Sequence, residues 1–297
     1  MTFVPVATRR GAHIISYAQA AQSRSGRLLI RAVENASGRR RLIARAGGTA
    51  AQIAPGQDFW QVMTARFGLR LDIRAGQLDA IPATGPLIVV GNHPFGILDG
   101  LMMGHIMSLR RGPDFRVLAN SVFCHDRVMD RHLLPISFET TRAAIAQNLD
   151  ARRAALQFLD QRGAIGVFPG GTVSTAPRPF GQPVDPAWRG STARMIAKSN
   201  ATVVPVFFDG QTSRLFQIAS HLNKNLRLAL LIKEFNRRVD SVVPVSIGAP
   251  IDSARLQEFA GDPLACMDFL RTMTYALSPT AVDPTVYGYD FEEKHKR

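Results

Sequence analysis

Cysteine is scarce in this chain of 297 residues, which contains only Cys124 and Cys266. Two cysteines without a metal-ligand spacing predict neither a disulfide framework nor a metal site, so we expect two reduced core thiols in a cytoplasmic protein. Long apolar runs are missing too, because no stretch approaches the roughly 20 residues that span a bilayer. Residues 1–20 lack the continuous apolar segment of a signal peptide. Any association with a membrane is therefore expected to be peripheral.

Acidic residues are also few. The chain has 36 Lys and Arg against 23 Asp and Glu, which gives a net charge of +13. Residues 1–46 hold nine arginines and a single acid, Glu34. Such a region indicates an anionic partner, either nucleic acid or a lipid surface, unless it is simply a solvated basic face. Because the sequence contains no helix-turn-helix, zinc or aromatic RNA-binding signature, we expect an anionic membrane surface and no nucleic acid.

The basic region, residues 1–57, is expected to form a helical unit ahead of a larger domain over residues 58–297. Residues 13–46 predict one or two helices that are interrupted near Gly38. A basic amphipathic helix can lie among lipid headgroups, or it can pack on the larger domain with its arginines in water, and both interpretations stand at this point. The expected apolar stripe consists of Ile14, Ile15, Tyr17, Ala18, Ala21, Leu28, Leu29, Ala32, Val33, Leu42, Ile43 and Ala46.

From residue 58 onward, strand-like and helix-like segments alternate, which predicts an α/β fold with a mostly parallel sheet flanked by helices. In such sheets, sites form at the carboxyl ends of the strands. Proline is disfavoured in a central strand, so a bulge or a sheet edge is expected at Pro205. The expected strands are Leu69–Arg74, Leu87–Gly91, Phe115–Asn120, Ile136–Phe138, Ala164–Phe168, Thr202–Phe208 and Val242–Ile247. The expected helices follow Asp58 and lie near Leu98–Arg110, Thr141–Gln161, Ser191–Ser199, Ser213–Arg237, Ala254–Phe259 and Pro263–Leu277.

A histidine and an aspartate follow the expected strand Leu87–Gly91. Pro94 and Gly96 predict a tight turn directly after His93, with a helix beyond it. Histidine takes up a proton near neutral pH, and a nearby carboxylate can hold its ring in the right tautomer. Five residues separate His93 from Asp99, which on a continuous helix would place the two side chains roughly 120° apart. They can meet only if the Pro-Phe-Gly stretch is not helical; the alternative is a structural histidine and an unrelated aspartate.

A glycine turn follows a second buried strand, Ala164–Phe168. Gly170 and Gly171 let the backbone approach a ligand closely. Successive N–H groups, together with the hydroxyls of Thr172 and Ser174, can bind an anion or an oxyanion. The alternative is an ordinary turn.

Three blocks in this order resemble the lysophospholipid and glycerolipid acyltransferase family, which includes 1-acylglycerol-3-phosphate acyltransferases. The blocks are Asn92–Gly100, Phe168–Ser174 and Val203–Val206, within residues 80–250. The chain looks closest to a bacterial subgroup with segments of the form Asn-His-Pro-x-Gly-x-x-Asp-Gly and Phe-Pro-Gly-Gly-Thr-Val-Ser. Three ordered blocks are more specific than one, so the resemblance favours the catalytic interpretation of His93.

The resemblance implies an O-acyltransferase of bacterial phospholipid and related lipid metabolism, with residues 58–297 as the acyltransferase domain. His93 is then the general base that takes the proton from a lysolipid hydroxyl, and Asp99 orients it. The donor is an acyl thioester, either acyl-CoA or acyl-acyl-carrier-protein, and no further cofactor is expected. Direct attack by the substrate fits the lack of a Gly-x-Ser-x-Gly nucleophile elbow. The protein is expected in the cytoplasm, peripheral on the inner face of the membrane.

Two departures from the family pattern concern the acceptor. The family's Glu and Arg in the Phe168–Ser174 block are here Gly170 and Val173, and its spacing of four residues between His and Asp is five here. Since that Arg is associated with the acceptor's phosphate, its absence favours another head group, such as a lyso-aminolipid. The departures also leave open a lipid- or membrane-binding protein of the same fold that has lost catalysis. The expected substrate-binding residues are Asn92, Gly170, Gly171, Thr172, Ser174, Arg127, Arg178 and Arg194.

Overall fold

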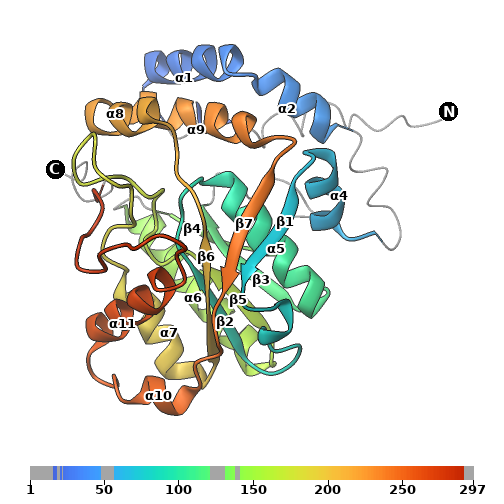
Figure 1. The fold of residues 1–297 in the computed structure, drawn as a ribbon, viewed down its shortest axis with the longest axis vertical. Coiled ribbons are helices and arrows are strands. Elements are labelled where there is room, and N and C mark those ends of the chain that lie inside the picture. Colours follow the sequence, from blue (N-terminus) through green and yellow to red (C-terminus); the bar gives the residue numbers. More distant parts are fainter. Residues whose placement is uncertain are drawn as a thin grey trace.

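The computed structural model of the protein describes residues 16–18, 21, 23–47, 57–120, 131–137 and 141–290. The strands in this part of the chain are β1 (Arg70–Ala75), β2 (Leu87–Gly91), β3 (Phe115–Asn120), β4 (Leu133–Ile136), β5 (Ala164–Val167), β6 (Thr202–Phe208) and β7 (Val242–Ile247). They form a seven-stranded sheet in the order β1-β7-β6-β2-β5-β3-β4 (Figure 1). The strands from β6 to β4 run parallel, whereas β7 pairs antiparallel with β6 and parallel with β1. The sheet is mostly parallel, which confirms the fold class predicted from the sequence.

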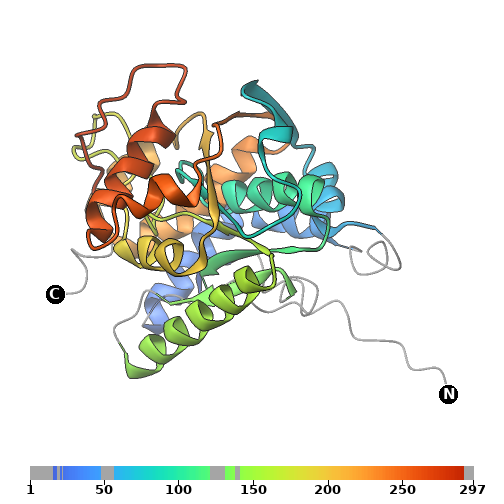
Figure 2. The same ribbon diagram turned by 90° about the horizontal axis from the view of Figure 1, so that it is seen from below.

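Helices cover both faces of this sheet (Figure 1; Figure 2). The helices are α1 (Arg24–Ala36), α2 (Arg39–Ala46), α4 (Phe59–Arg66), α5 (Ile97–Arg111), α6 (Arg142–Asp160), α7 (Gly190–Ser199), α8 (Arg214–Leu222), α9 (Lys224–Arg238), α10 (Ser253–Gln257) and α11 (Pro263–Tyr275). Alternate residues of each strand face opposite sides: in β2, Leu87 and Val89 enter one core, and Ile88 and Val90 enter the other. The first core packs under α1, α2, α4, α5, α8 and α9, and the second under α6, α7, α10 and α11.

Most predicted strands lie within a residue of their observed positions, but the one predicted over Ile136–Phe138 does not. The strand is Leu133–Ile136, which pairs with β3 and buries Leu133 and Leu134. Pro135 argues against a strand there, yet β4 is at the edge of the sheet, where a missing N–H is tolerated. Phe138 lies outside the described residues.

One long helix predicted over Ser213–Arg237 is in fact two. The backbone N–H of Asn223 donates to the carbonyl of Ala219 and ends α8, while its side chain accepts from the N–H groups of Asn225 and Leu226 and begins α9. Asparagine favours this capping conformation over the helix interior. The break matters for the site, because α9 then carries Arg227 to the glycine turn.

The N-terminal helices α1 and α2 pack on the rest of the fold. The predicted interruption at Gly38 is observed, but the helix begins at Arg24, and residues 13–15 lie outside the described residues. α1 lies along α9 (Figure 1), and Ile30 and Leu42 are completely buried in the first core. The predicted apolar stripe is therefore split. Leu42 is buried and Val33 and Ile43 pack against the core, so among the described residues of the stripe only Leu28 and Leu29 remain as large exposed apolar residues.

Pro205 lies in a central strand, at an irregularity of the kind predicted. Its carbonyl accepts from the N–H of Gly248, on the side that faces the segment after β7. Two residues of β6 lie between the pairs Val203–Ile251 and Val206–Ile247, against three residues of the facing segment. The facing segment therefore has one extra residue, which is a bulge. Pro205, which has no N–H to donate, lies in this stretch.

The structure describes one of the two cysteines. Cys266 is buried in α11, whereas Cys124 lies outside the described residues. Burial raises the pKa of the Cys266 thiol, which keeps it in its less reactive form.

No helix of the described ranges combines the length and the hydrophobicity that crossing a membrane requires.

Candidate active site

The carboxyl ends of β2 and β6 are joined by Asn92. Its side-chain amide donates to the carbonyl of Phe208 at 2.9 Å and accepts from the N–H of Phe208 at 2.7 Å. The side chain is buried and both of its polar groups bond to this one residue. Asn92 therefore fixes where the chain leaves β2, immediately before His93.

His93 and Asp99 meet across a non-helical turn. α5 begins only at Ile97, and Gly96 takes the positive φ of 78° that favours glycine. Nδ1 of His93 lies 3.0 Å from Oδ2 of Asp99. The condition drawn from the spacing, that the Pro-Phe-Gly stretch must not be helical, is met, and the fifth intervening residue is accommodated by the turn.

The Asp99 carboxylate is completely buried in the first turn of α5. Its Oδ2 also accepts from the N–H groups of Phe95 at 2.7 Å and Gly96 at 2.9 Å. Burial raises the pKa of Asp99, while His93 and the two N–H groups oppose that rise. With Nδ1 of His93 directed at Asp99, Nε2 is the ring nitrogen left to accept a proton from a substrate.

The ring of His93 is held between the two loops. It stacks on the ring of Phe168, with centroids 4.3 Å apart, and 18% of the side chain stays exposed. The carbonyl of His93 accepts from the N–H of Ser174 at 2.8 Å. Within the part of the chain that the structure describes, no Ser, Thr or Cys side chain bonds to this ring. Chemically, a histidine with one ring nitrogen at a buried carboxylate and the other free of the protein is suited to accept a proton from a hydroxyl.

The glycine turn after β5 is partly used to build the loop itself. Gly171, at a φ of 70°, donates its N–H to the carbonyl of Phe168, and the hydroxyl of Ser174 donates to Asp185. The side chain of Thr172 accepts from Arg227. The Gly171 N–H and the hydroxyls of Thr172 and Ser174, which the sequence suggests as anion-binding groups, therefore already have hydrogen-bond partners within the protein.

Arg227 is a buried residue of α9 that reaches this loop and that the sequence did not single out. Its guanidinium donates to the hydroxyls of Thr175 at 2.7 Å, Ser220 at 2.6 Å and Thr172 at 3.0 Å, and to the carbonyl of Val173 at 2.9 Å. α9 contains several arginines, and periodicity alone does not tell which of them faces the site. The positive charge that Val173 lacks is thus brought to this loop by α9, where it is buried and bonded to oxygens of the protein.

A second cation lies beside the His93 turn. The guanidinium of Arg238 lies 4.2 Å from the ring centroid of Phe95 and donates to the carbonyl of Gln211. Burial lowers the pKa of Arg238, while the nearby charges of Glu234 and Asp99 oppose the shift. Arg238 is half-buried, so unlike Arg227 it retains an exposed portion.

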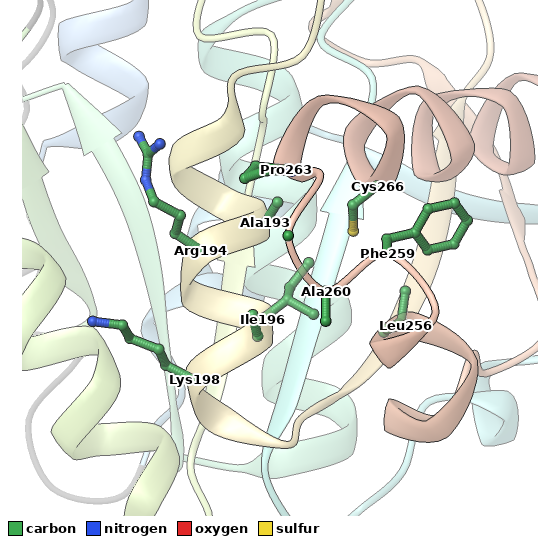
Figure 3. Close-up of a pocket in the computed structure, with 11 residues that line it drawn as sticks. Ala193, Arg194, Ile196, Lys198, Leu256, Phe259, Ala260, Pro263 and Cys266 are labelled. Carbon is green, nitrogen blue, oxygen red and sulfur yellow. The ribbon is translucent and has the colours of Figure 1, made fainter.

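The structure describes two of the three arginines predicted to contact anions, Arg178 and Arg194, and places them on different segments. Arg127 lies outside the described residues, and Arg178 is exposed on the loop after β5. Arg194 is exposed on α7, which forms one wall of a cavity of about 180 Å³ against α10 and α11. Arg194, Ile196 and Cys266 are among the residues that line this cavity, and in Figure 3 the Arg194 guanidinium points to the side away from Cys266.

Comparison with known proteins finds one family, two relatives and one solved structure worth reporting. A family model described as acyltransferase matches residues 52–283. The chain is 24% identical to a lyso-glycine lipid O-acyltransferase of Phocaeicola vulgatus, over 75% of this chain and 78% of that protein. It is 22% identical to a second lyso-glycine lipid O-acyltransferase, from Bacteroides thetaiotaomicron, over 75% and 80%. The crystal structure of the 1-acyl-sn-glycerophosphate acyltransferase PlsC from Thermotoga maritima matches with a TM-score of 0.47 and 14% identity, over 84% of this chain and 94% of that one.

Proposed function

Because this chain belongs to the acyltransferase family, we propose that it transfers a fatty acyl group from acyl-CoA or acyl-acyl-carrier-protein to the hydroxyl of a lysolipid. The observation that carries the proposal is the 3.0 Å contact between His93 and the buried Asp99 at the carboxyl end of β2. The net charge of +13 suits an anionic donor and an anionic membrane surface. We place the reaction on the cytoplasmic face of the membrane.

The reaction proceeds by direct attack. Nε2 of His93 takes the proton from the lysolipid hydroxyl as its oxygen forms a bond to the thioester carbonyl carbon. The tetrahedral intermediate collapses by breaking the carbon–sulfur bond, and the imidazolium returns its proton to the departing thiolate. The products are an acylated lipid and a free thiol. Asp99 keeps the Nδ1 proton in place and stabilises the transient imidazolium.

The alternative is a lipid-binding protein of this fold that has lost catalysis. Both members of the pair are present, and the longer spacing between them is absorbed by the Gly96 turn. A buried carboxylate costs free energy, so a protein without catalysis gains nothing from Asp99 beyond capping the turn. These observations favour the enzyme.

We infer that the acceptor is a lyso-aminolipid and not a lysophosphatidic acid. Val173 can neither donate a hydrogen bond nor carry charge, and its side chain is buried. The four bonds of Arg227 to oxygens of the protein leave it poorly placed to give a phosphate the bidentate contact that arginine otherwise provides. The two curated relatives are named for a lyso-glycine lipid, which is an aminolipid.

We expect the purified protein to acylate a lyso-aminolipid faster than lysophosphatidic acid, given the same donor in the same vesicles. A phosphomonoester would be left without a well-paired cation, and a poorly paired anion is costly in a partly buried site. The measurement is the ratio of kcat/KM for the two acceptors, with His93→Ala protein as the blank. A ratio that favours lysophosphatidic acid by about tenfold, or about 1.4 kcal/mol, would contradict the assignment.

We also propose that α1 docks on the membrane. Leu28 is 73% exposed and Leu29 is 47% exposed. Leu28 lines a shallow surface hollow together with Arg24, Arg27 and Arg31. An apolar residue flanked by arginines suits an anionic lipid surface. Since α1 packs on α9, and α9 carries Arg227 into the glycine loop, docking through α1 keeps the site near the lipid.

We expect Leu28→Glu combined with Leu29→Glu to weaken binding to anionic vesicles by roughly tenfold or more, because each buried leucine contributes about 1.5–3 kcal/mol and the new charges are repelled. Vesicle co-sedimentation at several salt concentrations measures this. Leu264→Glu is the matched control, since Leu264 is 66% exposed but lies on α11. Equal co-sedimentation of the double variant and the wild type would reject the proposal. Deleting residues 1–46 is a poorer test, because it removes the buried Ile30 and Leu42.

A further inference from the structure

A completely buried carboxylate, Asp185, lies in the loop between β5 and α7. Its Oδ2 accepts from the indole N–H of Trp188 at 2.9 Å. Its backbone is fixed as well, since its N–H donates to the hydroxyl of Tyr275 at 2.7 Å and its carbonyl accepts from Arg271 at 3.1 Å. α11, which contributes Tyr275 and Arg271, therefore determines where this carboxylate stands.

Asp185 is connected to His93 in two ways. Its Oδ1 accepts from the backbone N–H of His93 at 3.1 Å and from the hydroxyl of Ser174 at 2.5 Å. Ser174 in turn donates its backbone N–H to the carbonyl of His93 at 2.8 Å. The carboxylate and Ser174 thus hold both peptide groups of His93, one on each side of its Cα. The position of the imidazole relative to Asp99 depends on this closed set of bonds.

The same carboxylate occupies the space beside Gly170. A Cβ added at Gly170 would lie 3.3 Å from Cβ, Cγ and Oδ2 of Asp185. The φ of Gly170 is not positive, so its backbone does not require glycine. A side chain at position 170 would be in tight contact with Asp185, which would have to move by a few tenths of an ångström. The Asp185 carboxylate thus lies beside the position that a side chain at residue 170 would occupy.

We propose that Asp185 is a positioning residue for acyl transfer. In the family pattern a Glu stands at position 170, and here Asp185, from the other end of the same loop, supplies a carboxylate in its place. It does not touch the reacting atoms; it acts through the backbone of His93 and through Ser174. The proposal rests on the proposed acyl transfer for its kinetic consequence, but the hydrogen bond to His93 can be followed without that reaction.

The test compares Asp185→Ala, Asp185→Asn, Gly170→Glu and the double variant Gly170→Glu with Asp185→Ala. Asp185→Ala is expected to lower kcat by roughly 10–10²-fold with little change in either KM, because small misplacements of a catalytic group carry costs of this size. Gly170→Glu alone places a second carboxylate against Asp185 and should also lower kcat. In the double variant the space is free, so the carboxylate introduced at position 170 should restore at least about tenfold of the loss. Asp283→Ala, at an exposed carboxylate, is the control.

A second readout separates this proposal from the proposed function. The backbone amide resonance of His93 in a ¹⁵N–¹H spectrum should move strongly in Asp185→Ala and return toward the wild-type position in the double variant. If wild-type protein transfers no acyl group but the resonance behaves in this way, acyl transfer is wrong and the link between Asp185 and His93 stands. Folded Asp185→Ala with wild-type kcat and an unmoved resonance overturns the proposal, as does a double variant no better than Asp185→Ala. If Asp185→Ala does not fold, Asp185→Asn decides by the same criteria.

Discussion

Purified His93→Ala protein is expected to lose acyl transfer by roughly 10²–10⁴-fold or more, the range measured for removal of a general base. Nε2 is the ring nitrogen that faces away from Asp99, and no other described side chain bonds to the ring to take over its part. The fold should persist, because the bonds that anchor residue 93 to Asp185 and Ser174 use its backbone and not its ring. The measurement is kcat, with circular dichroism and thermal unfolding to establish folding.

His105→Ala provides the matched control for this variant. His105 is on the same helix as Asp99, about 9 Å further along the axis. The His105→Ala variant also loses a partly buried imidazole, but one that does not contact Asp99, so it shows how much activity is lost through the loss of an imidazole alone. We expect near-wild-type turnover for His105→Ala, and near-wild-type turnover for His93→Ala would exclude His93 as the base.

Asp99→Asn should lower kcat by roughly 10²–10⁴-fold while leaving the protein folded. The asparagine oxygen can still accept from Phe95 and Gly96, so the turn keeps its cap. The negative charge that stabilises the imidazolium is lost. Because burial raises the pKa of Asp99, the charge is unfavourable for the fold, and the free energy of unfolding should stay unchanged or rise.

Asp99→Ala separates the two contributions of this residue. It leaves the N–H groups of Phe95 and Gly96 without their acceptor, which costs about 1–3 kcal/mol for each unsatisfied buried group. We expect the asparagine variant to lose activity alone, and the alanine variant to lose activity and stability. Equal stability of the two variants in urea unfolding would show that the cap contributes little, and wild-type kcat in Asp99→Asn would exclude its role in orienting His93.

The His93–Asp99 turn could be predicted because its signals are local. Pro94 and Gly96 disfavour a helix directly after His93, and the spacing requires a non-helical turn if the two side chains are to meet. The strands were predictable for a similar reason, since buried parallel strands are short apolar runs bounded by turn residues. The strand at β4 was predicted over Ile136–Phe138 and is observed over Leu133–Ile136, where Pro135 is tolerated because the strand is at the edge of the sheet.

The remaining parts of the site depend on contacts between distant segments. Asp185 is 92 residues from His93 along the chain, and Arg227 is 52 residues from Thr175. A single carboxylate in a loop, or one of several arginines on a helix, carries no local signal of what it will touch. The N-terminal stripe illustrates the same limit. Its pattern predicts an amphipathic helix, but only packing on α9 decides that Leu42 is buried and Leu28 is not.

Release of thiol from an acyl thioester, measured together with formation of the lipid ester, tests the central claim most directly. The assay uses purified full-length protein, acyl-CoA or acyl-acyl-carrier-protein as donor, and lyso-aminolipid in anionic vesicles, with His93→Ala protein alongside. The account predicts that the wild type releases one thiol for each ester formed, only when lysolipid is present, and that His93→Ala does neither. Thiol release that is independent of lysolipid, or no release by the wild type with either donor, would contradict it.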